Sequence, residues 1–210
     1  MGFPAFFAQA PVLRLRDGLS QLLGATPDGV IEYRYADAVR LAGHSCPTVA
    51  GAWLCLRAGL GALYGDALPE RGGIAASLPE AEDAGVAGVI GQVVTLVTGA
   101  TGVGGFKGLG GRHARNGLLR YGDAAAGGMR LRRLDSGAAV EIEWQSASVP
   151  PAADMRALFE PVLSGTASAD QRLRFAEAWQ DRVRRLLLDH ADDPAVVRVR
   201  HLESREPASG

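Results

Sequence analysis

The sequence lacks the features that place a chain in several large classes of protein. Its 210 residues include two cysteines, too few for a disulfide framework, and 22 basic against 23 acidic residues, so no net charge attracts nucleic acid. The longest apolar segment, residues 84–97, is shorter than the roughly 20 residues that cross a bilayer. Because 47% of the residues are hydrophobic and 21% are charged, wholesale disorder is excluded. We therefore expect a globular, cytoplasmic protein that binds neither nucleic acid nor membrane.

Lysine is almost absent, since Lys107 is the one lysine among the 22 basic residues. Genomic base composition explains this bias most simply. Lys107 lies in a glycine-rich segment, residues 99–117, whose backbone and cationic side chain would suit a phosphate or a carboxylate. A flexible, solvated loop is the alternative.

Apolar spacing predicts a chain that mixes helices and strands. Two adjacent prolines within residues 148–153 mark the best internal boundary. We expect an α+β core, residues 1–149, with a mixed or antiparallel sheet packed by helices, and a helical C-terminal extension, residues 150–210. The predicted helices cover residues 11–24, 36–41, 47–64, 84–98, 152–163 and 169–190, and the predicted strands cover residues 30–35, 73–78, 118–121, 129–134, 138–144 and 196–202.

One short motif indicates chemistry: Gly43-His44-Ser45-Cys46-Pro47. It directly precedes a predicted helix, because proline is tolerated at the first helical position. A helix N-terminus favours negative charge, so a cysteine there becomes a better nucleophile or metal ligand. His44 would be a second ligand or the base that takes the thiol proton. The alternative is a buried cysteine beside a capping histidine, without chemistry.

The motif resembles the Gly-His-x-Cys-Pro-Gly signature of the FmdE family, which takes its name from a component of formylmethanofuran dehydrogenase. The family continues with a Cys-Gly-Val-Asp helix, then Leu-Thr-Gly-Cys-Thr, then a Gly-Lys-Gly loop. The similarity covers about residues 30–145 and leaves residues 150–210 outside it. In the same order as the family, this chain has Ala84-Gly85-Val86-Ala87, Val97-Thr98-Gly99-Ala100-Thr101 and Phe106-Lys107-Gly108.

The chain departs from the family at several motif positions. Ala84 and Ala100 stand where the family has cysteine, Thr48 where it has glycine, and Ala87 where it has aspartate. If relatives use those cysteines at the functional site, this chain has lost part of that site.

The resemblance implies an α+β fold, a homodimer and a divalent metal, zinc before others, held on the His-x-Cys motif. Thiolate and imidazole suit zinc, and a site with few protein ligands keeps a position open for water or substrate. A third protein ligand is needed. We expect the metal ligands to be His44, Cys46 and His113, with Asp37, Glu82 or Asp83 as alternatives to His113.

Three functions remain open from the sequence. The first is a metal- or thiol-dependent enzyme on a small one-carbon or acyl substrate, with Cys46, His44 and Lys107 as catalytic residues and Lys107 steadying an oxyanion. The second is a non-catalytic metal-binding accessory protein, which the lost cysteines favour. The third is a nucleotide-binding module. For a bound cofactor or anion, we expect the site to include Gly105, Lys107 and Gly108.

The nucleotide alternative rests on spacing alone. Gly99, Gly102 and Gly105 match the dinucleotide fingerprint of short-chain dehydrogenases. That fingerprint requires a strand before its first glycine and a helix after its last one. Residues 84–98 are helical in pattern, however, and residues 106–117 are too rich in glycine to start a helix cleanly.

Overall fold

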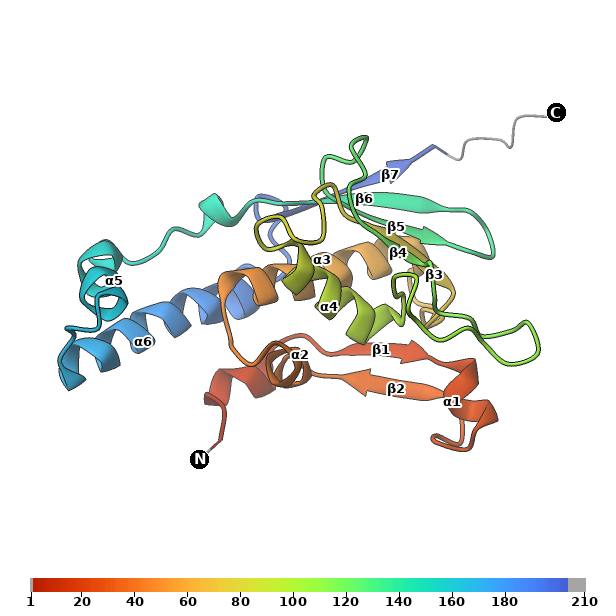
Figure 1. The fold of residues 1–210 in the computed structure, drawn as a ribbon, viewed down its shortest axis with the longest axis horizontal. Helices are drawn as coiled ribbons and strands as arrows, with labels where there is room; N and C mark the ends of the chain where they lie inside the picture. Colours follow the sequence, from red (N-terminus) through yellow and green to blue (C-terminus); the bar gives the residue numbers. More distant parts are fainter. Residues whose placement is uncertain (1, 204–210) are drawn as a thin grey trace.

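A computed structural model describes residues 2–203 of the chain. Figure 1 shows a layered α+β fold, in which helices α3 and α4 lie between a five-stranded sheet and a two-stranded sheet. The N-terminus lies near the small sheet, and a helical hairpin projects from one end of the body. The α+β prediction is confirmed.

The small sheet corrects one sequence prediction. Residues 11–24 do not form one helix, because Leu13 and Leu15 are buried while Arg14 and Arg16 are exposed, which is the alternation of a strand. The helix begins only after Asp17, which caps it. The first elements are η1 (Ala5–Gln9), β1 (Leu13–Arg16), α1 (Gly18–Leu22) and β2 (Val30–Tyr33), with β1 antiparallel to β2.

Two helices follow, and the second is the centre of the core. α2 (Tyr35–Ala42) ends at Gly43 in the left-handed conformation. α3 (Pro47–Tyr64) begins at Pro47 and ends at Gly65, as predicted. α3 is buried almost all round, which its uniformly apolar sequence requires. It packs on β5, β6, β7 and α4, and the Trp53 indole donates to the carbonyl of Pro11 at 2.9 Å.

The five-stranded sheet has the order β4-β3-β5-β6-β7. All neighbouring strands are antiparallel except β3 and β4. Its strands are β3 (Ile74–Ser77), β4 (Leu119–Arg120), β5 (Met129–Arg133), β6 (Ala139–Trp144) and β7 (Val197–Leu202), and α4 (Ala87–Thr98) lies between β3 and β4 in the chain.

The C-terminal part is helical but is not a separate appendage. It contains η2 (Ser146–Ser148), α5 (Met155–Leu163), α6 (Ala169–Arg184) and a π-helical turn η3 (Arg185–Asp189). α5 and the first half of α6 form the projecting hairpin (Figure 1). Leu186 and Leu187 of η3 are fully buried in the core, and β7 pairs with β6 over its whole length. The predicted boundary near residue 150 therefore separates the hairpin but not the final strand.

A buried ion-pair cluster ties the small sheet to the rest of the fold. The Asp17 carboxylate accepts two backbone N–H groups of α1, the guanidinium of Arg71 at 2.8 Å and that of Arg115 at 2.8 Å. Arg71 also donates to the carbonyl of Leu96, near the end of α4, at 3.2 Å. Asp17 is 3% exposed and Arg115 6%.

None of the helices in residues 2–203 combines the length and the apolarity needed to span a bilayer.

Candidate functional site

The segment that carries the His-x-Cys motif joins α2 to α3 and is held by three side chains. The backbone carbonyl of Ser45 accepts the Trp179 indole N–H at 3.1 Å and the Gln180 amide at 3.1 Å, both from α6. The Ser45 and Tyr35 hydroxyls share a hydrogen bond at 3.0 Å. Helix α6 thus fixes the backbone between His44 and Cys46.

The two motif side chains differ in environment. His44 is exposed, and its Nδ1 lies 2.9 Å from the carbonyl oxygen of Ala42. Cys46 is buried at the N-cap of α3 and makes no side-chain cap. In residues 2–203 no hydrogen bond joins the imidazole to the thiol. The two side chains are therefore not assembled as a nucleophile and its base.

The donor set does not fit a zinc site within one chain. Nowhere in residues 2–203 do three or more His, Cys, Asp or Glu side chains gather closely enough to hold a metal ion. His113 lies elsewhere, because its ring packs on Gly18. If Gly18 carried a Cβ atom, that atom would lie 3.2 Å from the Cε1 of His113 and 3.5 Å from a carboxylate oxygen of Glu70. The structure therefore does not bring His113 to His44 and Cys46. The resemblance predicts zinc binding, but the donor set of the described residues does not support it.

Lys107 and its glycine-rich loop lie at the other end of the molecule from the motif. Gly99 ends α4 in the left-handed conformation, and residues 100–118 fold back on themselves beside α1 (Figure 1). The backbone N–H of Gly117 donates to the carbonyl of Gly102 at 3.0 Å. Lys107 is exposed. Gly105 and Gly108 serve loop packing, because a Cβ at either position would collide with Thr101 or Arg112.

This arrangement lacks the elements that the dinucleotide fingerprint requires. A helix, α4, precedes Gly99 where the dinucleotide fingerprint needs a strand, and no helix follows Gly105 before β4 in the described residues. Without that geometry, the three glycines do not aim a helix N-terminus at a phosphate.

A cavity of about 340 Å³, which we call the α3–α4 cavity, lies close to the His-x-Cys segment. Thr48, in the first turn of α3, and Val86, the N-cap of α4, both line it. Met129, Ile142 and Trp144 on β5 and β6 also line it. The two helices that carry the family-like motifs therefore begin at one cavity.

The wall of this cavity is pre-shaped by a glycine. A Cβ at Gly51 would lie 2.5 Å from the Trp144 ring, so only glycine lets α3 approach the indole this closely. The cavity is thereby walled by a flat aromatic surface and the start of α3.

Polar groups in the cavity suit an uncharged carbonyl compound. No side chain caps the N-terminus of α3 or of α4. Pro47 has no N–H, and the N–H of Ala87 donates to the carbonyl of Ala84 at 3.1 Å, so the first-turn N–H groups without an intrahelical partner are those of the second and third helical positions. Glu80 is exposed at the cavity and disfavours a second negative charge. Burial raises the pKa of the Cys55 thiol to about 12, so this thiol stays protonated and is not a nucleophile.

Sequence reasoning found the helices but not the cavity. Cys55 and Trp53 are core residues. The cavity wall at Trp144 depends on contact between α3 and β6, about 90 residues apart in the chain, and no local pattern encodes it.

Comparison of the sequence with protein-family models and with curated proteins finds no match, so membership of the FmdE family stays a prediction that rests on the residues of the two motifs.

Proposed function

We propose that this chain is a small-molecule-binding protein that holds an uncharged acyl compound in the α3–α4 cavity, with the carbonyl oxygen toward the N-termini of α3 and α4. The observation that carries the proposal is the meeting of these two uncapped helix beginnings, at Thr48 and Val86, on one cavity. Partial positive charge at each N-terminus attracts a carbonyl oxygen.

The size and lining of the cavity support a small ligand. Its volume of about 340 Å³ lies at the lower end of the range for ligand pockets, which are mostly apolar with a few polar groups. Met129, Ile142 and Trp144 supply the apolar part. An acyl group with a short aliphatic or aromatic substituent matches this division.

Binding without catalysis is the role that the residues favour. The cavity thiol, Cys55, is protonated, and His44 is exposed and hydrogen-bonded to its own backbone segment. Acyl chemistry needs an activated nucleophile within reach of a base. The resemblance to the FmdE family adds independent support for a small acyl or one-carbon ligand, and the departures at Ala84 and Ala100 support an accessory role.

Ligand-observed NMR with uncharged acyl probes tests the proposal. The probes are N-methylacetamide, propionamide and benzamide, each titrated into the full chain. Thr48→Phe adds a ring at a residue that lines the cavity, and Thr166→Phe makes the same change at an exposed position outside it. Thermal melts of both variants check that they are folded.

We expect at least one probe to bind the wild type, to bind the Thr166→Phe variant equally, and to lose binding in the Thr48→Phe variant. Failure of all three amides to bind would overturn the proposal. So would binding that survives in a folded Thr48→Phe variant, because the ligand would then occupy another site.

A further inference from the structure

The outer face of the five-stranded sheet carries a second hollow, independent of the α3–α4 cavity. α3 covers one face of the sheet, and Figure 1 shows no helix over the other face in residues 2–203. Side chains alternate along β5, so Met129 and Leu131 are buried against α3 while Arg130 and Arg132 point outward. The hollow on this outer face has a volume of about 600 Å³, and we call it the sheet-face cleft.

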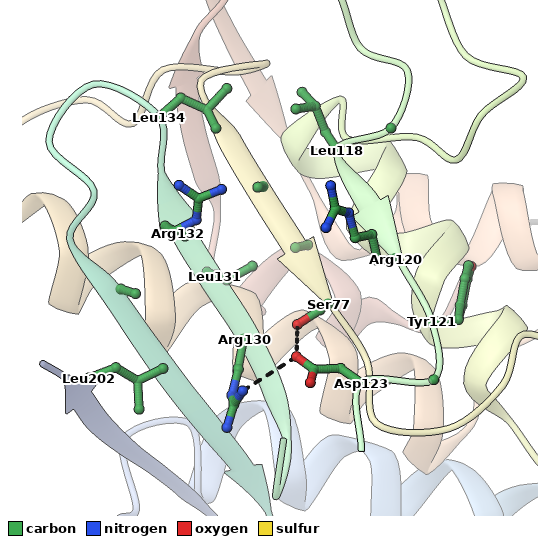
Figure 2. Close-up of a pocket in the computed structure, with 15 residues that line it drawn as sticks. Ser77, Leu118, Arg120, Tyr121, Asp123, Arg130, Leu131, Arg132, Leu134 and Leu202 are labelled. Carbon is green, nitrogen blue, oxygen red and sulfur yellow. Dashed lines mark hydrogen bonds and ion pairs between the residues drawn. The ribbon is translucent and has the colours of Figure 1, made fainter. Parts of the chain in front are cut away.

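One end of the cleft is a closed network of paired charges. Asp123 accepts the Ser77 hydroxyl at 2.8 Å and the Arg130 guanidinium at 3.4 Å (Figure 2). Arg130 also donates from Nε to Glu141 at 2.7 Å, and Arg200 donates to the same carboxylate at 2.6 Å. Two arginines thus balance two acids at this end.

The middle of the cleft holds two arginines without such partners. Arg120 and Arg132 line the cleft and are exposed, and within residues 2–203 neither has a hydrogen-bond acceptor or an ion-pair partner for its side chain. They stand on β4 and β5, on either side of β3 (Figure 2). Since neighbouring strands lie about 4.8 Å apart, their backbones are separated laterally by about 10 Å.

The β3 side chains between these two arginines are small. In the strand register Ala75 is opposite Arg132, and Ser77 is opposite Arg120. Because both residues are small, long arginine side chains from both sides can lean over β3 and reach one bound group. A pair of guanidiniums facing a shared space is an arrangement for carboxylate or phosphate, whose planar or tetrahedral oxygens accept several N–H bonds.

Leucines lie beyond the arginines. Leu118 and Leu134 occupy the end of the cleft away from the Ser77–Asp123–Arg130 network (Figure 2). The cleft therefore presents, in order, a neutral hydrogen-bonding end, two unpaired cations and an aliphatic end.

From this order we infer that the sheet-face cleft binds a small organic anion, a carboxylate or a phosphate monoester, that carries an aliphatic group. The anionic group lies between Arg120 and Arg132, and the aliphatic group lies on Leu118 and Leu134. A nucleic-acid strand fits less well, because Asp123, Glu141 and Glu143 interrupt the positive charge along this face.

The experiment measures binding of hexanoate, hexyl phosphate and inorganic phosphate to the full chain by calorimetry. The variants are Arg120→Gln and Arg132→Gln, with Arg14→Gln as the matched control on an exposed strand position outside the cleft. Leu134→Ala tests the aliphatic end. Thr48→Phe, which blocks the α3–α4 cavity, separates this site from the other one.

We expect hexanoate or hexyl phosphate to bind the wild type, and the dissociation constant to rise about tenfold or more in Arg120→Gln and in Arg132→Gln. The Arg14→Gln and Thr48→Phe variants should bind as the wild type does. Leu134→Ala should weaken the binding of hexanoate and of hexyl phosphate and leave the binding of inorganic phosphate unchanged. Comparison of hexanoate with hexyl phosphate shows which anion the cleft prefers.

Three outcomes would overturn the inference. The first is that neither hexanoate nor hexyl phosphate binds to the wild type. The second is binding that is unchanged in folded Arg120→Gln and Arg132→Gln variants. The third is tighter binding of a single-stranded oligonucleotide than of hexanoate or hexyl phosphate, because the sheet face would then bind a polyanion.

Discussion

Replacing Asp17 with asparagine should strongly destabilise the fold, because Asp17 is the one acid in the described residues that forms ion pairs with both Arg71 and Arg115. Asp17 is 3% exposed, and its carboxylate receives both guanidiniums at 2.8 Å. An asparagine keeps one oxygen for the α1 cap but places an N–H₂ group against an arginine. Removing one partner of a buried ion pair typically costs about 3–5 kcal/mol, because the remaining charge stays buried. For a chain of this length, that corresponds to a fall in melting temperature of about 6–20 °C.

The pH dependence of the effect follows from the pKa of Asp17. Burial raises that pKa, but hydrogen bonds from Arg71 and from the backbone N–H of Ser20, with the charges of Arg115 and Arg71, outweigh burial and hold it below the ordinary value of 3.8. A carboxyl whose pKa is lowered by folding stabilises the fold above its unfolded-state pKa. This stabilisation is lost as the pH falls through the folded-state pKa. The difference between wild type and Asp17→Asn should therefore be full at pH 7 and should shrink below pH 3.8.

Urea unfolding followed by tryptophan fluorescence at pH 7 and at pH 3 measures both quantities. Asp192→Asn is the matched control, because its partner is Arg57 and its side chain is 80% exposed. An exposed pair contributes at most about 1 kcal/mol. The reasoning is refuted if Asp17→Asn costs no more than Asp192→Asn at pH 7, or if its cost is the same at both pH values.

Two further predictions concern the cysteines. We expect the purified chain to hold well below one zinc per chain, because His44 and Cys46 lack a third ligand in the described residues; elemental mass spectrometry that finds one zinc, lost in Cys46→Ser, would contradict this. We also expect iodoacetamide at pH 8 to modify Cys55 much more slowly in the folded Cys46→Ser variant than after unfolding, because burial raises the pKa of its thiol to about 12 and leaves little reactive thiolate. Labelling of the folded variant at the rate of the unfolded chain would show that the thiol is not held protonated by burial in the core.

The sequence predicts those parts of the fold that local rules decide. α3 begins at Pro47 and ends at Gly65 because a proline suits the first helical position and a glycine lets the chain leave the helix. The helix prediction for residues 11–24 was wrong because their leucines satisfy both a helical and an alternating pattern. Pairing of β1 with β2, which periodicity does not report, decided for the strand.

Long-range contacts decide the rest, and those contacts have no local signature. β7 joins β6 across more than 50 residues, so the prolines near residue 150 mark a hairpin and not the end of the core. Asp17 and Arg115 are 98 residues apart in the chain. At the motif, two residues that are close in sequence separate in space: His44 turns to solvent and Cys46 turns into the core.

The unpaired arginines show most clearly what only the register reveals. Alternation along residues 129–133 predicts that Arg130 and Arg132 share one face of a strand. It does not predict which of the two forms an ion pair with a carboxylate. In the sheet Arg130 is opposite Glu141 and pairs with it, whereas Arg132 is opposite Ala139 and has no carboxylate across the strand. The anion-binding inference depends on this difference and was therefore beyond sequence reasoning.

The register of β5 links the two proposed sites while keeping them separate. Met129 lines the α3–α4 cavity from one face of the sheet, and Arg132 lines the sheet-face cleft from the other. A slip of one residue would turn the arginines of β5 into the core, so burial of Met129 and Leu131 holds the arginines outward. Substitution of Arg132 changes only the outward face and leaves the buried side chains in place. Loss of anion binding in Arg132→Gln with amide binding intact is therefore the result that this geometry requires, and loss of both together would mean that the two faces are not independent.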